Sequence, residues 1–324
     1  MRWLRKLLRK NCPTARSQTG RRDWSKVATA LTIIAAGGSS GIGSACAQDL
    51  EPRAYSASPI GTNFLVSGYT RTTGGISLDP SLPITGVRGT IDSATLGYDR
   101  TFDLAGRSAS VAIQLPYVHG DFTGQVEEQS SHVSRSGLGD LRMRFAVNLF
   151  GAPALTPAEF QQRPPTTTLG TSLTIIAPTG EYNPQRLINI SSNRFAFKPE
   201  LGVSQPLGDW FVEAYAGAWV FTNNGDFFGG HVRSQAPLWA FQAHAGYNFR
   251  PGLWLAADAT YYTGGETSID GAAKHGTLAT SRYGLTLSVP IGAGFSAKLA
   301  WSTWLRARNG GTFQTIGVAL QFRW

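Results

Sequence analysis

The segment FQTIGVALQFRW, residues 313–324, decides the fold. From residue 316 onward, large apolar side chains occupy every second position: Ile316, Val318, Leu320, Phe322 and Trp324. Successive side chains of a β-strand point to opposite faces, so this segment predicts a strand with one apolar face and one hydrated face. The closing strand of a bacterial outer-membrane β-barrel alternates in this way and places aromatic residues at the membrane interface. The alternative is an edge strand of a soluble sheet. The rest of the sequence decides between these two interpretations.

The composition favours strands over helices. Only 15% of the 324 residues are charged, and the chain contains 38 Gly, 9 Trp, 10 Tyr and 17 Phe. Glycine suits tight turns, and aromatic residues suit strands. The net charge of +9 is concentrated in residues 1–47, which hold nine Lys/Arg and one Asp, whereas residues 48–324 hold twenty Lys/Arg and nineteen Asp/Glu. The basic balance therefore belongs to the first 47 residues and does not indicate a nucleic-acid partner.

Residues 1–47 have the features of a secretory signal peptide. A basic region precedes an apolar run over residues 27–36, and small residues lead to the sequence Ala-Cys-Ala at 45–47. The apolar run is far too short to span a bilayer as a helix. We therefore predict cleavage before Gln48, which leaves an outer-membrane β-barrel domain over residues 48–324.

Other interpretations of this leader are weaker. Two arginines at residues 21–22 resemble a twin-arginine signal, but a barrel bound for the outer membrane is exported unfolded. Cys46 as a lipoprotein acceptor lacks a bulky aliphatic residue three positions earlier. The run GGSSGIG at 37–43 resembles the phosphate-binding turn of short-chain dehydrogenases, but no Tyr of the chain is followed four residues later by Lys. We predict no cofactor, and since Cys12 and Cys46 both lie in the leader, no cysteine-based site in the processed chain.

Eleven further segments alternate in the same way. Their ranges are 63–70, 93–102, 109–117, 140–149, 169–178, 194–205, 210–222, 236–249, 254–262, 282–289 and 295–305. Twelve strands is an even number, and short turns alternate with longer loops, as in outer-membrane barrels. A polar loop is expected over residues 120–136, and the link at 151–168 is expected to form a small periplasmic excursion. The fold class is therefore all-β, an antiparallel transmembrane β-barrel of about twelve strands whose last segment closes against residues 63–70.

Aromatic residues near the ends of these segments predict two interfacial girdles. One girdle contains Trp210, Phe249, Trp254 and Trp324, and the other contains Tyr117, Phe221, Tyr262 and Trp304.

The polar face of segment 140–149 is the best candidate for a selectivity site, because Arg142 and Arg144 alternate there with large apolar residues. In a membrane barrel such charges stay hydrated in the lumen. Further lumen candidates lie on the polar faces of the other segments: Asp99, Gln114, Arg194, Lys198, Glu200, Glu213, Gln242, His244, Asp258, Arg282 and Lys298. Facing pairs of opposite charge would order water across the lumen and screen polar solutes. The alternative is that these charges pair and rigidify a plugged lumen.

Four blocks of sequence carry a resemblance to a known family. They are RAY at 53–55 with GTNFL at 61–65, SGLGDLR at 136–142 with GAP at 151–153, PTGEY at 178–182, and KPELG at 198–202. With these blocks the chain resembles a family of outer-membrane transporters named for the meta-pathway of phenol degradation. The resemblance implies an outer-membrane location and a role in uptake.

The leading functional hypothesis is a passive or substrate-selective channel for small, aromatic or hydrophobic, compounds, and not an enzyme. A twelve-stranded barrel is wider than the eight-stranded kind that side chains fill, and narrower than an open porin. One alternative is an outer-membrane lipid hydrolase that uses His132 and Ser134, the one His-x-Ser spacing in the chain. Another is a structural barrel without transport. The five His are scattered without metal-ligand spacing, so no metal is predicted.

Three kinds of partner follow from this hypothesis. They are the lipid and lipopolysaccharide of the outer membrane, a small-molecule solute, and the barrel-assembly machinery. The last is expected to read an assembly signal made of Leu320, Phe322 and Trp324.

Overall fold

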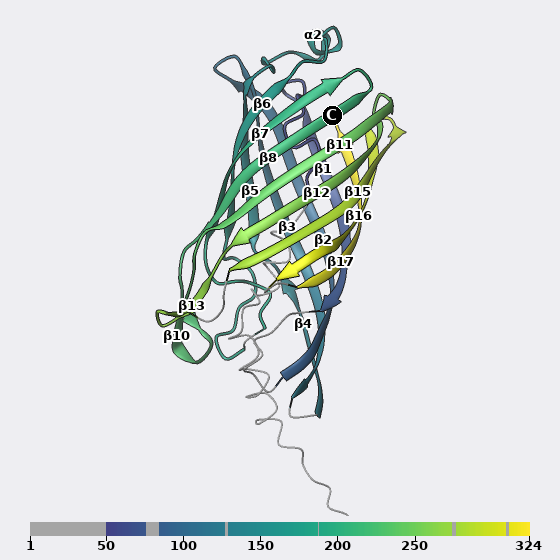
Figure 1. Cartoon of the computed structure of the whole chain (residues 1–324). Coiled ribbons are helices and arrows are strands. Elements are labelled where there is room, and N and C mark those ends of the chain that lie inside the picture. The colour runs from purple at the N-terminus through teal and green to yellow at the C-terminus, as the bar shows by residue number, and fades with distance from the viewer. Residues whose placement is uncertain (1–49, 76–83, 127–128, 187, 274–276, 309–310) are drawn as a thin grey trace, which may run out of the picture.

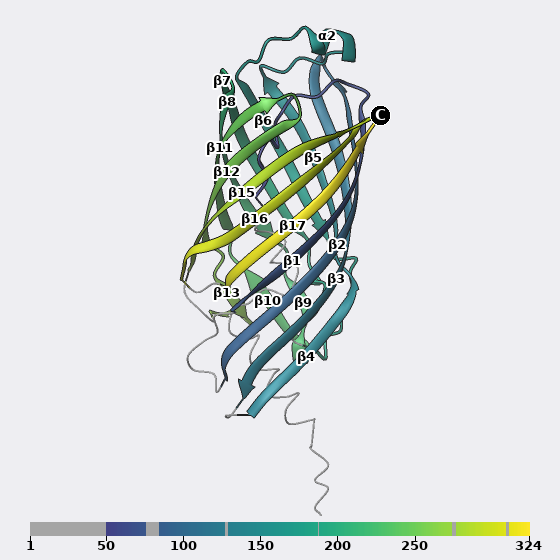
Figure 2. The same cartoon turned by 90° about the vertical axis from the view of Figure 1, so that its right-hand side faces the viewer.

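The computed structural model describes residues 50–75, 84–126, 129–186, 188–273, 277–308 and 311–324, which form a β-barrel (Figures 1 and 2). The predicted signal peptide, its cleavage site and the glycine-rich run at 37–43 lie outside the described residues. Within the described residues, twelve strands make the wall: β1 (Asn63–Gly75), β2 (Ile84–Leu104), β3 (Arg107–Val126), β5 (Leu141–Phe150), β6 (Thr168–Ala177), β7 (Ala196–Leu207), β8 (Trp210–Phe221), β11 (Leu238–Arg250), β12 (Leu253–Gly264), β15 (Leu278–Gly292), β16 (Phe295–Arg308) and β17 (Thr312–Arg323).

Strand β1 closes the barrel, because it pairs antiparallel with both β2 and β17. The register with β17 runs from Phe64 opposite Arg323 to Gly75 opposite Thr312. Figure 2 shows β16, β17, β1 and β2 side by side across this closure. The wall therefore has no open edge, which removes the unpaired backbone groups that lipid cannot hydrate. The prediction that residues 313–324 form the closing strand is confirmed.

Four two-residue turns lie at one end of the barrel, at residues 105–106, 208–209, 251–252 and 293–294. The C-terminus and the short helix α2 (Pro157–Gln161) lie at the same end (Figure 1). Helix α2 begins at a capping box, in which Thr156 and Glu159 satisfy each other's backbone N–H groups. Short turns mark the periplasmic end of outer-membrane barrels, so the link that carries α2 is periplasmic, as expected.

The opposite end extends further than the sequence predicts. Instead of a loop over residues 120–136, β3 continues to Val126, and β4 (Gln129–Leu138) pairs back with it. The prediction is wrong because this hairpin projects past the wall, where neither face has to be apolar and the alternation is weak. At the same end, loops carry a second sheet made of β9 (Asn224–Phe227), β10 (His231–Gln235), β13 (Thr267–Ile269) and β14 (Ala272–Ala273), with the 3-10 helix η4 (Phe228–Gly230) between β9 and β10.

The two faces of the wall differ as the alternation predicts. Large apolar side chains point outward and are exposed, as at Leu96 (60%), Leu201 (55%) and Ile316 (58%). Polar and charged side chains point inward and are mostly buried, as at Glu200 and Asp258. The outer belt suits lipid tails, and the inner face keeps its charges away from them. Among the described residues, no helix is long and apolar enough to cross a membrane.

Part of the predicted aromatic girdles is wrong. Trp210, Phe249, Trp324 and Tyr117 are more than half exposed on the outside, as expected. Trp254 and Tyr262, in contrast, are 5% and 1% exposed. Their register explains this, because Trp254 pairs with Ser288 and Tyr262 with Thr280, both buried inside the barrel. Phe221 packs on the interior cluster of Trp219 and Tyr262. Trp304 pairs with the inward Arg282 but is 42% exposed, so its place in the girdle stays a prediction. Position near a strand end therefore does not decide which face a residue occupies.

Candidate functional site in the barrel lumen

The charged residues predicted to line the lumen all lie on the inner side of the wall strands or, for Arg194, just before β7. Seven of them are buried: Arg194, Lys198, Glu200, Glu213, His244, Asp258 and Arg282. Arg142, Arg144 and Asp99 are partly buried, and the Lys298 ammonium lies 5.7 Å from the centroid of the inward Trp254 ring. The structure thus supports their placement, while their role in selectivity stays a prediction.

The buried charges of β7, β11 and β12 pair with neighbours on the same side of the barrel. Lys198 Nζ lies 2.9 Å from Glu200 Oε2, two residues along β7. His244 Nδ1 lies 2.7 Å from Asp258 Oδ1, directly opposite in the β11–β12 register. The Lys198–Glu200 pair offsets the cost of removing two charges from water, and the imidazole of His244 gives the buried Asp258 carboxylate a hydrogen-bond partner. Both carboxylates are therefore satisfied by neighbours along the wall.

The segment that precedes β1 lies inside the barrel and covers this charged wall. We call residues 50–61 the N-terminal segment. Its Glu51 forms an ion pair of 2.5 Å with Arg142, and the backbone N–H of Arg53 donates to Glu213 at 2.7 Å. At the periplasmic end, the Ile60 N–H donates to the Leu155 carbonyl at 2.9 Å. The sequence does not predict this position, because residues 50–61 have no periodicity that would place them in the lumen.

Tyr55 is the central anchor of the N-terminal segment and is 1% exposed. Its hydroxyl lies 3.0 Å from both Ser172 Oγ and Glu200 Oε1. Its ring fills a slot between Gly170 on β6 and Gly202 on β7, which are directly opposite in register. A Cβ at either glycine would lie 2.3 or 2.2 Å from the ring, too close for any other residue. The two inward glycines on paired strands are the sequence signal that could have revealed the slot.

Arg53 anchors the segment at a second point. Its guanidinium lies 4.2 Å from the centroid of Phe211 and 5.1 Å from that of Trp254, within the range of cation–π attraction. Nη2 of Arg53 also donates to Asn248 Oδ1. Phe211 and Trp254 meet edge to face at 6.0 Å, so they form an interior aromatic pair near the periplasmic turns.

The electrostatics of Glu51 fit its position beside three cations. Burial raises the pKa of this carboxyl, but the charges of Arg142, Lys198 and Arg144 outweigh burial and hold the pKa at about 2. Glu51 belongs to the N-terminal segment and not to a membrane-spanning strand. It stays ionised at every physiological pH, so its contact with Arg142 is a permanent ion pair.

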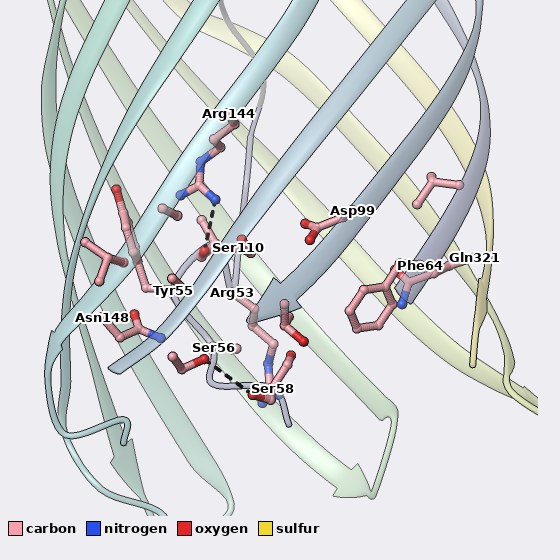
Figure 3. Close-up of a pocket in the computed structure, with 17 residues that line it drawn as sticks. Arg53, Tyr55, Ser56, Ser58, Phe64, Asp99, Ser110, Arg144, Asn148 and Gln321 are labelled. Atoms are coloured by element: carbon pink, nitrogen blue, oxygen red, sulfur yellow. Dashed lines mark hydrogen bonds between the residues drawn. The ribbon is translucent and has the colours of Figure 1, made fainter. Parts of the chain in front are cut away.

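A cavity of about 240 Å³ lies between the N-terminal segment and the wall made by β1, β2, β3, β5 and β17 (Figure 3). Arg53, Tyr55, Ser56 and Ser58 border it from the segment. The strands contribute two charged side chains, Asp99 of β2 and Arg144 of β5. The other lining side chains are uncharged, and the main ones are Phe64, Val66, Ser108, Ser110, Ala146, Asn148 and Gln321. The segment thus leaves open space along one wall while it covers the other.

The residues of the hydrolase alternative lie on the β3–β4 hairpin. His132 Nε2 lies 3.3 Å from Asp121 Oδ1, and His119 Nε2 lies 3.0 Å from Asp121 Oδ2. These contacts direct His132 to a carboxylate and not to Ser134, whereas nucleophilic catalysis requires a base that contacts the Ser hydroxyl. In the part of the chain that the structure describes, no group of His, Cys, Asp and Glu is arranged to hold a metal ion.

A closed antiparallel barrel with an apolar outer belt and a polar interior is an outer-membrane β-barrel. The chain belongs to the family described as MetA-pathway of phenol degradation, whose model matches residues 68–322. This confirms the resemblance seen in the sequence.

Two solved structures show the same architecture. The chain is similar to an outer membrane channel from Pseudomonas putida F1, with 22% identity and a TM-score of 0.73 over 85% of this chain and 100% of that one. It is also similar to the transport unit of the autotransporter AIDA-I from Escherichia coli, with 9% identity and a TM-score of 0.50 over 92% and 97% of the two chains. At these identities the likeness establishes the fold alone. None of the curated proteins compared with the chain matches it.

Proposed function

We propose that the protein is a passive, substrate-selective channel for small compounds, aromatic or hydrophobic ones among them, and that the solute passes between the N-terminal segment and the wall of β1, β2 and β17. The single observation that supports this route most is the cavity on that side of the segment.

Small residues line the inner face of these three strands about halfway along their length. Gly68 of β1, Gly97 of β2 and Gly317 of β17 point inward, and Ala319 lies opposite Gly68 in the register. The longer charged side chains of β7, β11 and β12 are held on the other side by their neighbours and by the N-terminal segment. A passage bordered by small side chains on one side and by a tethered peptide on the other admits small solutes and excludes large ones.

Arg142 and Arg144 are proposed to set selectivity, with Asp99 opposite them across β3. They occupy one inward face of β5, at the boundary between the covered wall and the open route. Arg142 is neutralised by Glu51, whereas Arg144 borders the cavity. Of the two, Arg144 therefore has the more direct access to a passing solute.

A matched pair of substitutions tests the route. Val66→Trp places an indole in the cavity wall, whereas Ser67→Trp places the same group one residue away on the outer, lipid-facing side. Liposomes that carry the mature chain, residues 48–324, should swell in small neutral solutes, and Val66→Trp should slow swelling at least fivefold while Ser67→Trp does not. Heat-dependent mobility in detergent gels confirms that each variant is folded. Swelling no faster than that of empty liposomes, from folded protein, would refute the channel and favour a structural barrel.

A further inference from the structure

Asp99 and Arg144 lie in one row of the inner wall, at opposite ends of a gap. In the register, Asp99 of β2 faces Ala112 of β3, and Ala112 faces Arg144 of β5. Neighbouring strands are about 4.8 Å apart, so the two Cα atoms are roughly 10 Å apart. The alanine between them fills little of this space. An anionic and a cationic group thus border the same cavity with room between them (Figure 3).

Both groups keep hydrogen-bonding capacity that the described residues do not use. Nε and Nη2 of Arg144 and Oδ1 of Asp99 are shielded from solvent and have no hydrogen-bond partner among the described residues. Nη1 of Arg144 donates to the Ala54 carbonyl at 3.4 Å, and the guanidinium lies 5.1 Å from the centroid of Tyr55. A shielded polar atom without a partner is costly, so a ligand that moves the neighbouring side chains aside and pairs with these atoms gains affinity.

The uncommitted atoms define the chemistry of the ligand. Nε and Nη2 lie on one edge of the planar guanidinium, which is the fork that binds a carboxylate through two parallel hydrogen bonds. An ionised Asp carboxylate only accepts hydrogen bonds, so the other end of the ligand has to donate one. Ser110 of β3 borders the cavity between the strands of Arg144 and Asp99, whereas the ring of Tyr55 lies beyond Arg144 and the side chains of Phe64 and Val66 lie beyond Asp99. The volume of about 240 Å³ is below that of pockets for drug-sized ligands, which limits the size.

We propose that this cavity is a solute subsite for small organic carboxylates that carry a hydroxyl or amino donor at the far end. Arg144 binds the carboxylate and Asp99 accepts from the donor, and the body of the solute crosses the short side chains of β3 between them. The subsite refines the proposed channel and rests on it, because it names the class of solute that pauses on the route.

Three probes that share one benzene ring and differ in their polar groups separate the two contacts. We would measure their binding to the detergent-solubilised mature chain by calorimetry: 4-hydroxybenzoate has both groups, benzoate lacks the donor, and 4-hydroxybenzyl alcohol lacks the carboxylate. The expected order places 4-hydroxybenzoate first, with at least a tenfold loss for each missing group. Arg144→Gln should abolish the advantage of the carboxylate, and Asp99→Leu, which leaves no acceptor at this position, should remove the preference for 4-hydroxybenzoate over benzoate without weakening benzoate. The control Arg282→Gln, which removes a lumen cation that does not border the cavity, should change the affinity for 4-hydroxybenzoate less than twofold.

The outcomes separate this inference from the channel itself. Equal affinity for the three probes, or full 4-hydroxybenzoate binding by Arg144→Gln, would overturn the subsite even if the liposomes still take up solutes. Lysine at position 144 keeps the charge but loses the fork, so Arg144→Lys should retain less than a tenth of the wild-type affinity. If liposome uptake fails while the probes bind in the expected order, the channel is refuted and the binding site stands.

Discussion

Release of Tyr55 from its slot is the perturbation whose effect can be worked out most directly. The ring is 1% exposed, and its hydroxyl contacts Ser172 and Glu200. Replacing a fully buried aromatic side chain by Ala costs about 3–5 kcal/mol. We call the N-terminal segment docked when it lies against the inner wall and undocked when it has left it. If the whole cost falls on docking, Tyr55→Ala raises the undocked population roughly a hundredfold to a few thousandfold, because about 1.4 kcal/mol corresponds to a factor of ten.

The same release can be forced from the wall. In Gly202→Val, the new Cβ would lie 2.2 Å from Cε2 of Tyr55, so the ring and the side chain cannot both stay. The neighbouring Val203→Ile, on the outward face of the same strand, is the matched control. Tyr55→Phe keeps the ring and should shift docking by only about 1 kcal/mol.

Single-channel recording in planar bilayers measures the result. Tyr55→Ala and Gly202→Val should both add frequent transitions to a state of larger conductance, whereas Val203→Ile should behave as the unaltered chain. If both perturbing variants fold and show unaltered conductance and current noise, the N-terminal segment does not control the width of the lumen.

Four further predictions concern the buried polar pairs and the closing strand. Glu51→Gln leaves Arg142 without its carboxylate, so the channel should become more anion-selective, which reversal potentials in a salt gradient measure. Because the pKa of Glu51 is about 2, below its usual 4.5, this pair stabilises docking above about pH 4.5 and is lost only as the pH falls towards 2. The frequency of transitions to the state of larger conductance should therefore be the same at pH 7 and pH 5. His244→Ala leaves buried Asp258 without its imidazole and should destabilise the barrel by about 3–5 kcal/mol, seen as a lower temperature of the gel-mobility transition. Deleting residues 322–324 removes the aromatic end of the proposed assembly signal and should leave the chain unfolded outside the membrane. If the shortened chain still forms a barrel with normal heat-dependent gel mobility, these residues are not an assembly signal.

The barrel could be predicted from the sequence because alternation is a local property. The large apolar residues of each strand identify the side that faces lipid, as Ile316, Val318 and Leu320 do in β17. The charged residues at the alternate positions then have to point inward. The β3–β4 hairpin could not be predicted, because its residues leave the membrane and no longer have to alternate. The outermost part of β2 was missed for the same reason.

The position of the N-terminal segment depends on tertiary contacts, which the alternation of apolar and polar residues does not reveal. Residues 50–61 have no period, and Tyr55 reads as an ordinary aromatic in a polar stretch. Its location depends on Gly170 and Gly202, more than a hundred residues away, which leave the slot that only a ring fills. The lumen candidates were placed on the correct side of the wall, but the sequence did not reveal that Arg142 is covered by Glu51 while Arg144 borders a cavity.

The most direct test of this account compares the conductance of the mature chain with that of a variant that lacks residues 50–58. Both are reconstituted in planar bilayers after their heat-dependent gel mobility has shown that they are folded. The intact chain should give small, steady channels, and the shortened chain should give channels of clearly larger conductance. Folded protein that conducts in neither form, or equally in both, would contradict a lumen that the N-terminal segment narrows and the wall of β1, β2 and β17 leaves open.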